Sequence, residues 1–551
     1  MRLRSIASWI GAMLLVAVPA QTVMAQTAPK PVQEMSAAPG KSGGEGGGFA
    51  TNVTLKAATL QEPFLQTIVG QPGPTPDGTT PEGRCLLLAY HDFSTTKDAP
   101  TQLTGASVRA GNDGTTEVCQ VDGFIAPQVG FRMVLPTTTW NGKFMQSGCG
   151  GRCGTYLPDA CEEQVKRGYA CMSNDLGHKS TTYDNLWAID NVPGEIDFGF
   201  RATHVAALTG KAIIEAYYNQ KPKYSYFIGA STGGRQALVA VQKFPNDYDG
   251  VVGGEPAMSV PGVSREEGRI RMGGSLIVDG KALITPDDVK MLNRVTVAAC
   301  DANDGLKDGI ITDPRTCKFE AQTLLCRGDK TPDCLTQVQI DAVNTIYRGG
   351  KGQQKGSELA WLGAYIAKDG SAGRYSTRRS ANPYNYPYTF VFDDATNPEI
   401  RPFEAAGGKF ILYTGWADEV INPNGPVRYY EGVERLVGSR KETQDFFRFF
   451  AIPGQSHIPG NVGAESIDYV KAIENWVEHG QAPDVLIGRK LKWITQMMGP
   501  MVLAKDNVPA NYLYSRPQYP YPIQARYKGK GDPTLAESFG PWDPIKKTWL
   551  K

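Results

Sequence analysis

The stretch "YSYFIGASTGGRQAL", residues 224–238, decides how the fold and the chemistry of this chain are interpreted. Its first residues indicate a buried strand, "GASTGG" indicates a tight turn, and a helix is expected from about Gly233 to Lys243. A strand, a sharp turn of small residues and a helix N-terminus together predict that Ser231 is a nucleophile on a strained elbow. The alternative is an N-capping serine at an ordinary strand-to-helix turn.

The G-x-S-x-G pattern is a weak signal by itself, because the chain has 62 glycines in 551 residues. A second match occurs at "GKSGG", residues 40–44. It lies in residues 26–50, which are rich in Pro, Gly and small polar residues and are predicted to form a disordered linker. No strand precedes Ser42 and no helix follows it, so Ser231 is the candidate nucleophile.

The first 25 residues have the pattern of a secretory signal peptide. Arg2 and Arg4 precede an apolar run, and small residues at Val23 and Ala25 suit cleavage. We therefore expect a secreted or periplasmic protein in which the ten cysteines form disulfides. No other segment is long and apolar enough to predict a membrane span, and a net charge of +1 gives no indication of nucleic-acid binding.

From about residue 117 the sequence alternates between strand and helix patterns. "CQVDGFIAPQVGFRMVLP" predicts paired strands, and the segment from Arg201 predicts a helix. This alternation predicts a largely parallel sheet with helices on both faces. The core is expected in two parts, residues 51–257 and 403–551.

The alternation is interrupted between residues 258 and 402, where most segments have a helical pattern. In "LTQVQIDAVNTIYRGG", Thr336 and Gln339 form a predicted capping box and Gly349 ends the helix. Its apolar residues are expected on one face: Val338, Ile340, Val343, Ile346 and Tyr347. We predict an inserted, mostly helical lid domain over 258–402.

The strand pattern resumes at "KFILYTG" and "FFRFFAIPG", and each strand is followed by a polar loop. Asp418 lies in the first loop and His457 in the second. The order nucleophile, acid, histidine at the carboxyl ends of successive strands predicts a catalytic triad with Ser231. The alternatives are a helix cap for Asp418 and an exposed loop position for His457. The other four histidines precede the elbow or lie on predicted helices: His91, His178, His204 and His479.

The chemistry that this triad predicts is acyl transfer. His457 removes the proton of Ser231 as the hydroxyl attacks an ester carbonyl, and water then releases the acid from the acyl-enzyme. The oxyanion is expected to lie between the amide of Thr232 and one from the loop "SGCGG", for which Gly150 is the candidate.

A second informative stretch is "CDANDGLKDGIITDPRTC", residues 300–317. Hard oxygen ligands for a structural calcium are offered by the carboxylates of Asp301, Asp304 and Asp308 and the carbonyls of Leu306 and Ile310. The loop is not an EF-hand, because position 12 counted from Asp301 is Thr312. The alternative is an acidic surface turn, but a disulfide between the flanking Cys300 and Cys317 would preorganise the ligands.

Taken together, these motifs resemble the tannase/feruloyl esterase family of α/β-hydrolases. The resemblance runs from about Arg84 to Gly540 and includes "WNGKF", "RGYA", "GASTGGRQAL", "GVVGGEPA", "CDANDGLKDGII", "GWADEVI", "PGQSHIPG" and "SRPQYPYPIQARYKGKGDP". It implies an α/β-hydrolase sheet with a lid, secreted hydrolysis of aromatic carboxylic esters, and calcium in the loop Asp301–Ile310 without an organic cofactor. It also implies the disulfides Cys300–Cys317 and Cys326–Cys334.

The chain departs from this family beside the catalytic residues. Members usually have a cysteine just before the serine and another just after the histidine, bonded to each other, whereas this chain has Ala230 and Ile458. Four cysteines cluster around the expected oxyanion loop, with their pairing left open: Cys149, Cys153, Cys161 and Cys171. We hypothesise that cross-linking has moved to this loop, and Cys85 with Cys119 is the remaining expected pair.

The sequence does not separate a galloyl from a feruloyl or a simpler aromatic ester as substrate. The aromatic run Tyr384–Phe392 suits a flat ring, but aromatic residues in a lid are more often part of its core. Two other functions fit the same residues. One is an esterase, lactonase or acyltransferase for a non-aromatic acyl group, and the other is an exported, non-catalytic binder of polyphenol or carbohydrate. The oligomeric state is left open.

Overall fold

The computed structural model describes residues 76–156, 158–181, 186–188, 190–259, 277–278, 281–348, 394–418, 420–457, 460–494, 497–498, 501–502 and 507–550. All of them belong to one compact unit, Pro74–Lys551. The expected signal peptide (1–25), the expected linker (26–50) and the aromatic run Tyr384–Phe392 lie outside the described residues.

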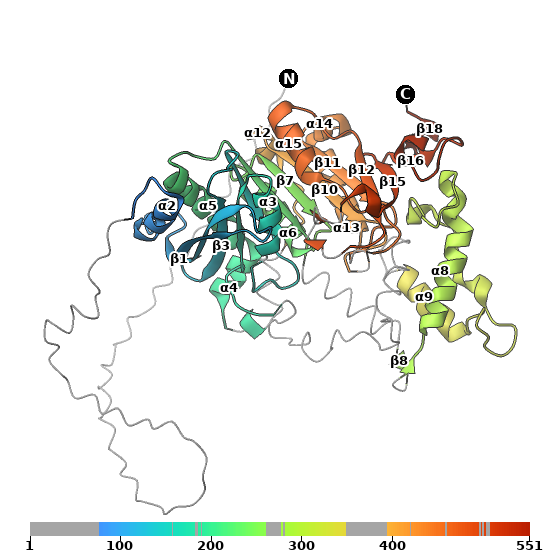
Figure 1. Cartoon of the computed structure of the whole chain (residues 1–551). Helices are drawn as coiled ribbons and strands as arrows, with labels where there is room; N and C mark the ends of the chain where they lie inside the picture. The colour runs from blue at the N-terminus through green and yellow to red at the C-terminus, as the bar shows by residue number, and fades with distance from the viewer. Residues whose placement is uncertain are drawn as a thin grey trace, which may run out of the picture. The chain divides into compact units, whose positions relative to one another are not determined.

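A mixed sheet of nine strands forms the centre of the unit (Figure 1). Its order is β1-β2-β3-β5-β4-β6-β7-β10-β11. The strands are β1 (Thr101–Ala110), β2 (Glu117–Ile125), β3 (Val129–Pro136), β4 (Lys143–Ser147), β5 (Ala170–Asn174), β6 (Tyr224–Ala230), β7 (Gly250–Gly254), β10 (Lys409–Gly415) and β11 (Phe447–Ile452). The pairs β1·β2, β2·β3 and β3·β5 are antiparallel, and all pairs from β5 to β11 are parallel. The expected α/β sheet and the expected pairing of β2 with β3 are therefore confirmed.

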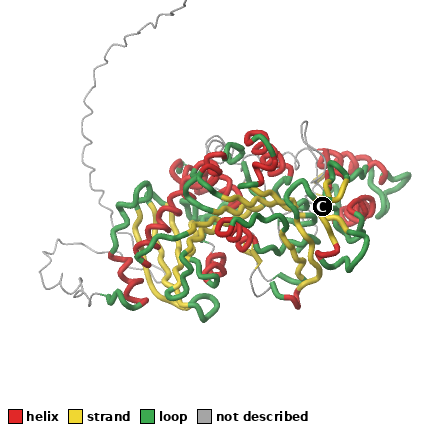
Figure 2. The backbone as a smooth tube through the Cα atoms, turned by 90° about the horizontal axis from the view of Figure 1, so that it is seen from above, coloured by secondary structure: helices red, strands yellow, loops and turns green. Residues whose placement is uncertain are grey.

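Helices cover both faces of the parallel strands, which form the continuous band in Figure 2. The larger apolar cluster includes residues of α5 (Ala202–Tyr218), α6 (Thr232–Lys243) and α13 (Asn424–Val437). The smaller one includes residues of α3 (Pro158–Val165) and α15 (Tyr469–His479). Because side chains alternate along a strand, the strands must be apolar on both faces.

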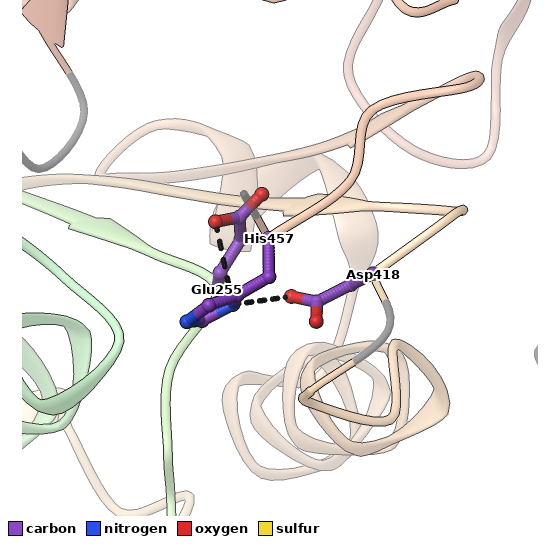
Figure 3. Close-up of side chains that lie close together, drawn as sticks. All are labelled: Glu255, Asp418 and His457. Carbon is purple, nitrogen blue, oxygen red and sulfur yellow. Dashed lines mark hydrogen bonds and ion pairs between the residues drawn. The ribbon is translucent and has the colours of Figure 1, made fainter. Parts of the chain in front are cut away.

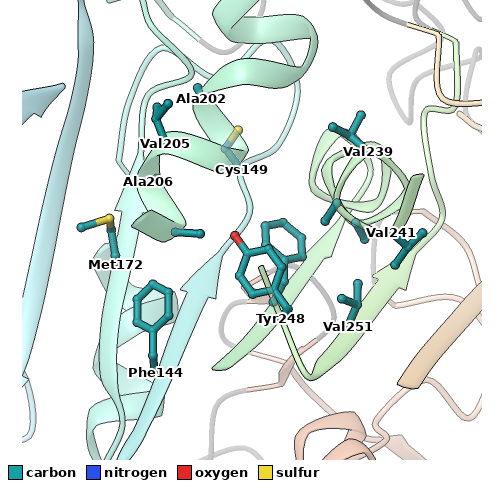
Figure 4. Packing of buried hydrophobic residues seen from close by; sticks show 14 of the residues in the cluster. Phe144, Cys149, Met172, Ala202, Val205, Ala206, Val239, Val241, Tyr248 and Val251 are labelled. Carbon is teal, nitrogen blue, oxygen red and sulfur yellow. The ribbon is translucent and has the colours of Figure 1, made fainter. Parts of the chain in front are cut away.

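Strand β10 shows this two-sided packing residue by residue. Phe410 and Leu412 belong to the larger cluster, whereas Ile411 and Tyr413 belong to the smaller one, and all four are nearly inaccessible to solvent. In the larger cluster, residues of α5 lie over Phe144 of β4 (Figure 4). Because the strands are held by apolar packing on both faces, their ends, and the polar loops that follow them, have fixed positions.

The described residues of the expected lid contain α8 (Pro286–Cys300) and α9 (Gln337–Arg348). They have a separate apolar cluster built from Ile284, Met291, Leu292, Ala321, Leu335, Ile340 and Val343. The expected capping box is present, since the Gln339 amide donates to Thr336 Oγ1 at 3.3 Å and the Thr336 amide to Gln339 Oε1 at 3.0 Å. Placing Val338 on the apolar face was wrong, because its side chain is 61% exposed.

The remaining elements are short or lie near the C-terminus. The helices are α2 (Pro81–Leu87), α4 (Val192–Ile196), α12 (Arg401–Ala405) and α14 (Arg440–Gln444). The strands are β8 (Ile277–Val278), β9 (Lys281–Ala282), β12 (Leu486–Leu491), β13 (Met497–Met498), β14 (Met501–Val502), β15 (Tyr512–Gln518), β16 (Gln524–Tyr527), β17 (Phe539–Asp543) and β18 (Thr548–Trp549). Within the described part of the chain, no helix combines the length and hydropathy of a membrane span.

Five disulfides use all ten cysteines. Three are the expected pairs, Cys85–Cys119, Cys300–Cys317 and Cys326–Cys334. The other two are Cys149–Cys153, inside the glycine-rich loop after β4, and Cys161–Cys171, which joins α3 to β5. Only one of the two therefore cross-links the loop itself.

The packing of α5 on β4 is tight enough to test with a single methyl group. A Cβ at Gly210 would lie 2.6 Å from Cζ of Phe144, whereas a Cβ at Gly425 in α13 would meet Met258 Sδ at an ordinary 3.6 Å. Overpacking costs about 1–3 kcal/mol, against a gain in helix propensity of about 1 kcal/mol. Gly210→Ala should therefore lower the Tm, and Gly425→Ala should leave it unchanged or raise it. Equal Tm values for the two variants would contradict this account of the core.

Candidate active site

Ser231 occupies the turn between β6 and α6 in a strained conformation. Its φ is 60° and its ψ is −116°, a combination that L-residues rarely adopt. The Ser231 amide donates to the Gly254 carbonyl at 2.9 Å, and its carbonyl accepts from the Ala257 amide at 3.0 Å. The hydroxyl makes no capping hydrogen bond to α6. The geometry is that of an elbow rather than of an ordinary N-cap.

Glycines allow the strand, the helix and the neighbouring loop to approach closely at this elbow. A Cβ on Gly229 would lie 2.8 Å from backbone atoms of Gly233, and a Cβ on Gly148 would lie 2.8 Å from Gly233 Cα. Real Cβ atoms do not tolerate such contacts with backbone. The "GASTGG" turn therefore requires glycine at these positions because the backbones pack too closely for a side chain.

The loop that contains Gly150 is fixed from several directions. The disulfide Cys149–Cys153 closes it, the Cys149 amide donates to Gln236 Oε1 at 3.0 Å, and Thr232 Oγ1 donates to the Gly151 carbonyl. Neither the backbone amide of Thr232 nor that of Gly150 donates a hydrogen bond to any of the residues that the structure describes. A Cβ on Gly150 would meet nothing within 4 Å, so the loop borders open space there.

His178 helps to hold the far end of the same loop. One of its ring nitrogens, Nε2, lies 2.8 Å from the Arg152 carbonyl, and the ring stacks on Trp187 with a centroid distance of 3.7 Å. Sequence analysis set His178 aside as a catalytic base because it precedes the elbow. In the structure its buried ring supports the loop between Cys149 and Cys153.

Asp418 and His457 meet beyond the carboxyl ends of β10 and β11. Asp418 is fully buried; its Oδ1 accepts from the amides of Val420 at 2.8 Å and Ile421 at 2.6 Å, and its Oδ2 lies 2.9 Å from His457 Nδ1. No helix begins at Asp418, because α13 starts at Asn424 with Pro423 as its N-cap, so the helix-cap alternative is not observed. Because the amides of the following turn use one carboxylate oxygen and the histidine uses the other, the carboxylate is held in one orientation.

A second carboxylate, from Glu255 at the end of β7, also faces this imidazole. Glu255 Oε2 lies 3.6 Å from His457 Nδ1, and Figure 3 shows both carboxylates in contact with the ring. The ligand atoms of the three residues lie within 4.8 Å of one another, a spacing that is possible for a metal ion. A buried carboxylate hydrogen-bonded to an imidazole is also the arrangement of an acid–base pair.

The sheet register places Ser231 and Glu255 at neighbouring positions on the same edge of the sheet. Gly254 of β7 pairs with Ala230 of β6 on one side and with Tyr413 of β10 on the other. Ser231 follows Ala230 and Glu255 follows Gly254, so both begin loops at the same edge of the sheet. Sequence analysis missed Glu255; its signal was a glutamate directly after the glycines that end an apolar strand.

The acidic loop of residues 301–310 is folded onto its own amides. Asp301 Oδ1 accepts from the amides of Gly309 at 3.1 Å and Ile310 at 3.2 Å, and Asp308 Oδ2 pairs with Arg516 Nη2 at 2.7 Å. Burial, together with repulsion by Asp308 and Asp301, raises the pKa of Asp304. The loop offers hard oxygen donors of the kind that calcium binds, but in the described structure they are bonded to amides and to Arg516. Among the described residues, the carboxylates of Asp301, Asp304 and Asp308 do not form a group with its oxygens within 4.8 Å of one another.

Comparison with known proteins identifies the family. The profile of the tannase and feruloyl esterase family matches residues 114–386 and 378–541. A probable feruloyl esterase B-2 of Aspergillus fumigatus is 30% identical over 439 residues, covering 71% of this chain and 80% of that protein. The mono(2-hydroxyethyl) terephthalate hydrolase of Piscinibacter sakaiensis is 27% identical over 557 residues, covering 82% and 89%.

Solved structures agree with this assignment. An esterase from Aspergillus oryzae superposes with a TM-score of 0.68 at 26% identity, covering 84% of this chain and 100% of that one. A fold, a serine elbow and a paired carboxylate and imidazole at one sheet edge thus accompany the sequence match. The chain belongs to the tannase and feruloyl esterase family and is a carboxylic ester hydrolase.

Proposed function

We propose that this protein is a secreted serine esterase that hydrolyses esters of aromatic carboxylic acids, such as hydroxycinnamic or gallic acid, through a triad of Ser231, His457 and Asp418. The observation that carries the proposal is the 2.9 Å contact between His457 Nδ1 and the buried Asp418 carboxylate, at the sheet edge where the strained Ser231 begins α6. The order of the three residues along the chain is that of other esterases with this fold.

In the proposed mechanism, Nδ1 of His457 keeps its proton throughout, whereas Nε2 takes up one proton and releases it again. With Nδ1–H donated to Asp418, Nε2 is left as the base that takes the Ser231 proton while Oγ bonds to the ester carbonyl carbon. His457 then gives this proton to the leaving alcohol oxygen as the ester bond breaks, which leaves the acyl-enzyme. A water molecule, deprotonated by the same nitrogen, releases the acid and restores the serine hydroxyl.

The amides of Thr232 and Gly150 are the proposed donors to the oxyanion. Two observations support them. Neither amide donates to another group among the described residues, and Gly150 borders open space. The disulfide Cys149–Cys153 and the bond from Thr232 Oγ1 to the Gly151 carbonyl would keep the two amides in place before the negative charge develops.

The aromatic substrate class is supported by the relatives. Both the feruloyl esterase and the terephthalate monoester hydrolase are named for esters of an aromatic acid. Membership of an esterase family favours catalysis over the non-catalytic binder considered from the sequence. Export is supported by the five disulfides, which persist in oxidising compartments. The residues 258–402 are proposed to form the lid over the substrate.

We further propose that a structural calcium ion is held by the carboxylates of Asp301, Asp304 and Asp308 and the carbonyls of Leu306 and Ile310. Burial, and after it the negative charge of Asp308 and Asp301, raises the pKa of Asp304, and the ion would offset that charge. The Cys300–Cys317 disulfide closes the loop that would hold the ion. The role of the ion is confined to the stability of the loop, and no step of the reaction involves it.

Ser231→Ala should lower kcat/KM for aromatic esters by at least about 10³-fold. A panel of methyl ferulate, methyl gallate and aliphatic p-nitrophenyl esters should give the aromatic esters the highest kcat/KM in the wild type. A fluorophosphonate should label the wild type and not the variant. The matched control is Ser42→Ala, in the other G-x-S-x-G sequence, which should keep full activity. A preference for aliphatic esters would contradict the substrate class, and an active, labelled Ser231→Ala would contradict the nucleophile.

Removal of calcium should lower the Tm of the wild type, and added calcium should restore it, because ligand binding to the folded state stabilises it. Asp304→Asn should abolish this response. Asp333→Asn, which removes an exposed carboxylate of the same region paired with Arg294, should retain it. An unchanged Tm after chelation, with no metal in the purified protein by elemental analysis, would contradict the calcium site.

A further inference from the structure

Glu255 combines three features that are each unfavourable for stability. Its φ is +44°, a left-handed conformation that is rare for residues other than glycine. Its side chain is buried, with only 5% of the residue exposed. Its carboxylate lies within 4.8 Å of another one, that of Asp418. Strain and buried charge of this kind persist at functional sites where the surroundings enforce them.

The contacts of Glu255 aim its carboxylate at the histidine. Its backbone amide donates to the Tyr413 carbonyl at 2.8 Å, which fixes the turn after β7. Gln455 Nε2 donates to Glu255 Oε1 at 2.7 Å, and Oε2 then lies 3.6 Å from His457 Nδ1. Gln455 is itself fixed, because its carbonyl accepts from the Ala417 amide at 2.9 Å.

Through Gln455, the contacts of Glu255 extend to the loop that bears Asp418 and the loop that bears His457. Ala417 precedes Asp418, and Gln455 lies two residues before His457. The ten cysteines form disulfides elsewhere, and Ala230 precedes Ser231, so no covalent link ties the serine strand to the histidine loop. The Glu255–Gln455 hydrogen bond is a noncovalent contact between the end of β7, the neighbour of the serine strand, and the histidine loop.

The charge of Glu255 acts on a set of groups that are otherwise neutral or negative. Among the described residues, the titratable groups that interact with it include Asp418 after β10, Tyr413 on β10, Tyr469 on α15 and His457 itself. Burial, and after it the charge of Glu255, raises the pKa of Tyr413 and of Tyr469 well above the ordinary value. Both phenols therefore stay neutral, and the imidazole is the group of this set that becomes positive during the reaction.

We propose that Glu255 is a positioning residue of the esterase centre, a second carboxylate that holds the His457 imidazole and, together with Asp418, stabilises its protonated form. The inference rests on the proposed function, since it assumes that His457 is the base. A negative charge within about 4–6 Å favours the imidazolium. Glu255 thus makes His457 a stronger base, and it lowers the barrier to proton transfer from Ser231.

The test is the pH dependence of kcat/KM in Glu255→Gln, which keeps the shape and removes the charge. The acid limb of the profile should move to lower pH by about one unit, because an imidazole beside fewer negative charges loses its proton at lower pH. The plateau of kcat should fall about tenfold, the equivalent of one such unit, while KM changes by less than about twofold. Glu255→Asp, which keeps the charge at greater distance, should show a smaller shift of the limb and a smaller loss of kcat.

The matched control is Glu162→Gln, which removes another buried carboxylate. Glu162 lies on α3 and pairs with Arg109 of β1. Its acid limb should coincide with that of the wild type. An unchanged limb in Glu255→Gln, or equal profiles for the Gln and Asp variants, would show a purely structural role and overturn the proposal. If Glu255→Gln does not fold, the Asp variant decides, and an unshifted limb overturns the inference. Failure of the proposed function itself appears separately, as activity that survives Ser231→Ala.

Discussion

The hydrogen bond between His457 Nδ1 and the buried carboxylate of Asp418 is the interaction on which the proposed chemistry depends. It exists because β10 and β11 are neighbouring parallel strands whose carboxyl ends open at the same edge. The two loops are joined at their bases, since the Trp416 amide donates to the Ile452 carbonyl and a Cβ on Gly415 would meet the Gln455 carbonyl at 2.2 Å. The apolar sheet is thus the scaffold that fixes a polar contact.

The features of the site that are unfavourable for stability, backbone strain and buried charge, lie together at one edge of the sheet. Ser231 and Glu255 both have positive φ, and they follow paired residues of β6 and β7. Asp418 and Glu255 are buried carboxylates beside one imidazole. Continuous apolar strands, packed on both faces, supply the stability that lets such a region persist. In the proposed mechanism, the conformational strain and the buried charge hold the groups ready for reaction.

Much of this arrangement was predictable from the sequence. Long two-sided apolar runs indicated the parallel strands, and a polar residue a few positions after each run indicated where functional groups would gather. Asp418 and His457 were found in this way, and their contact follows from strand order. Glu255 was missed because it directly follows "GVVGG", where a turn residue is expected, and only the folded register reveals that its carboxylate reaches His457.

Other features could not be predicted for identifiable reasons. Four cysteines near the loop after β4 allow three pairings, and the choice of Cys149–Cys153 depends on a tight loop geometry that spacing does not encode. Val338 was placed on the buried face because helical periodicity alone does not tell how wide the covered stripe is.

The central claim is that Ser231 and His457 act as one unit at the edge of the sheet. A crystal structure of the adduct formed with a fluorophosphonate tests it most directly. The account predicts phosphorus bonded to Ser231 Oγ, His457 Nε2 within about 3.2 Å of that oxygen, and the phosphonyl oxygen between the amides of Thr232 and Gly150. An adduct on another residue, or an imidazole well outside contact with Ser231 Oγ, would contradict it.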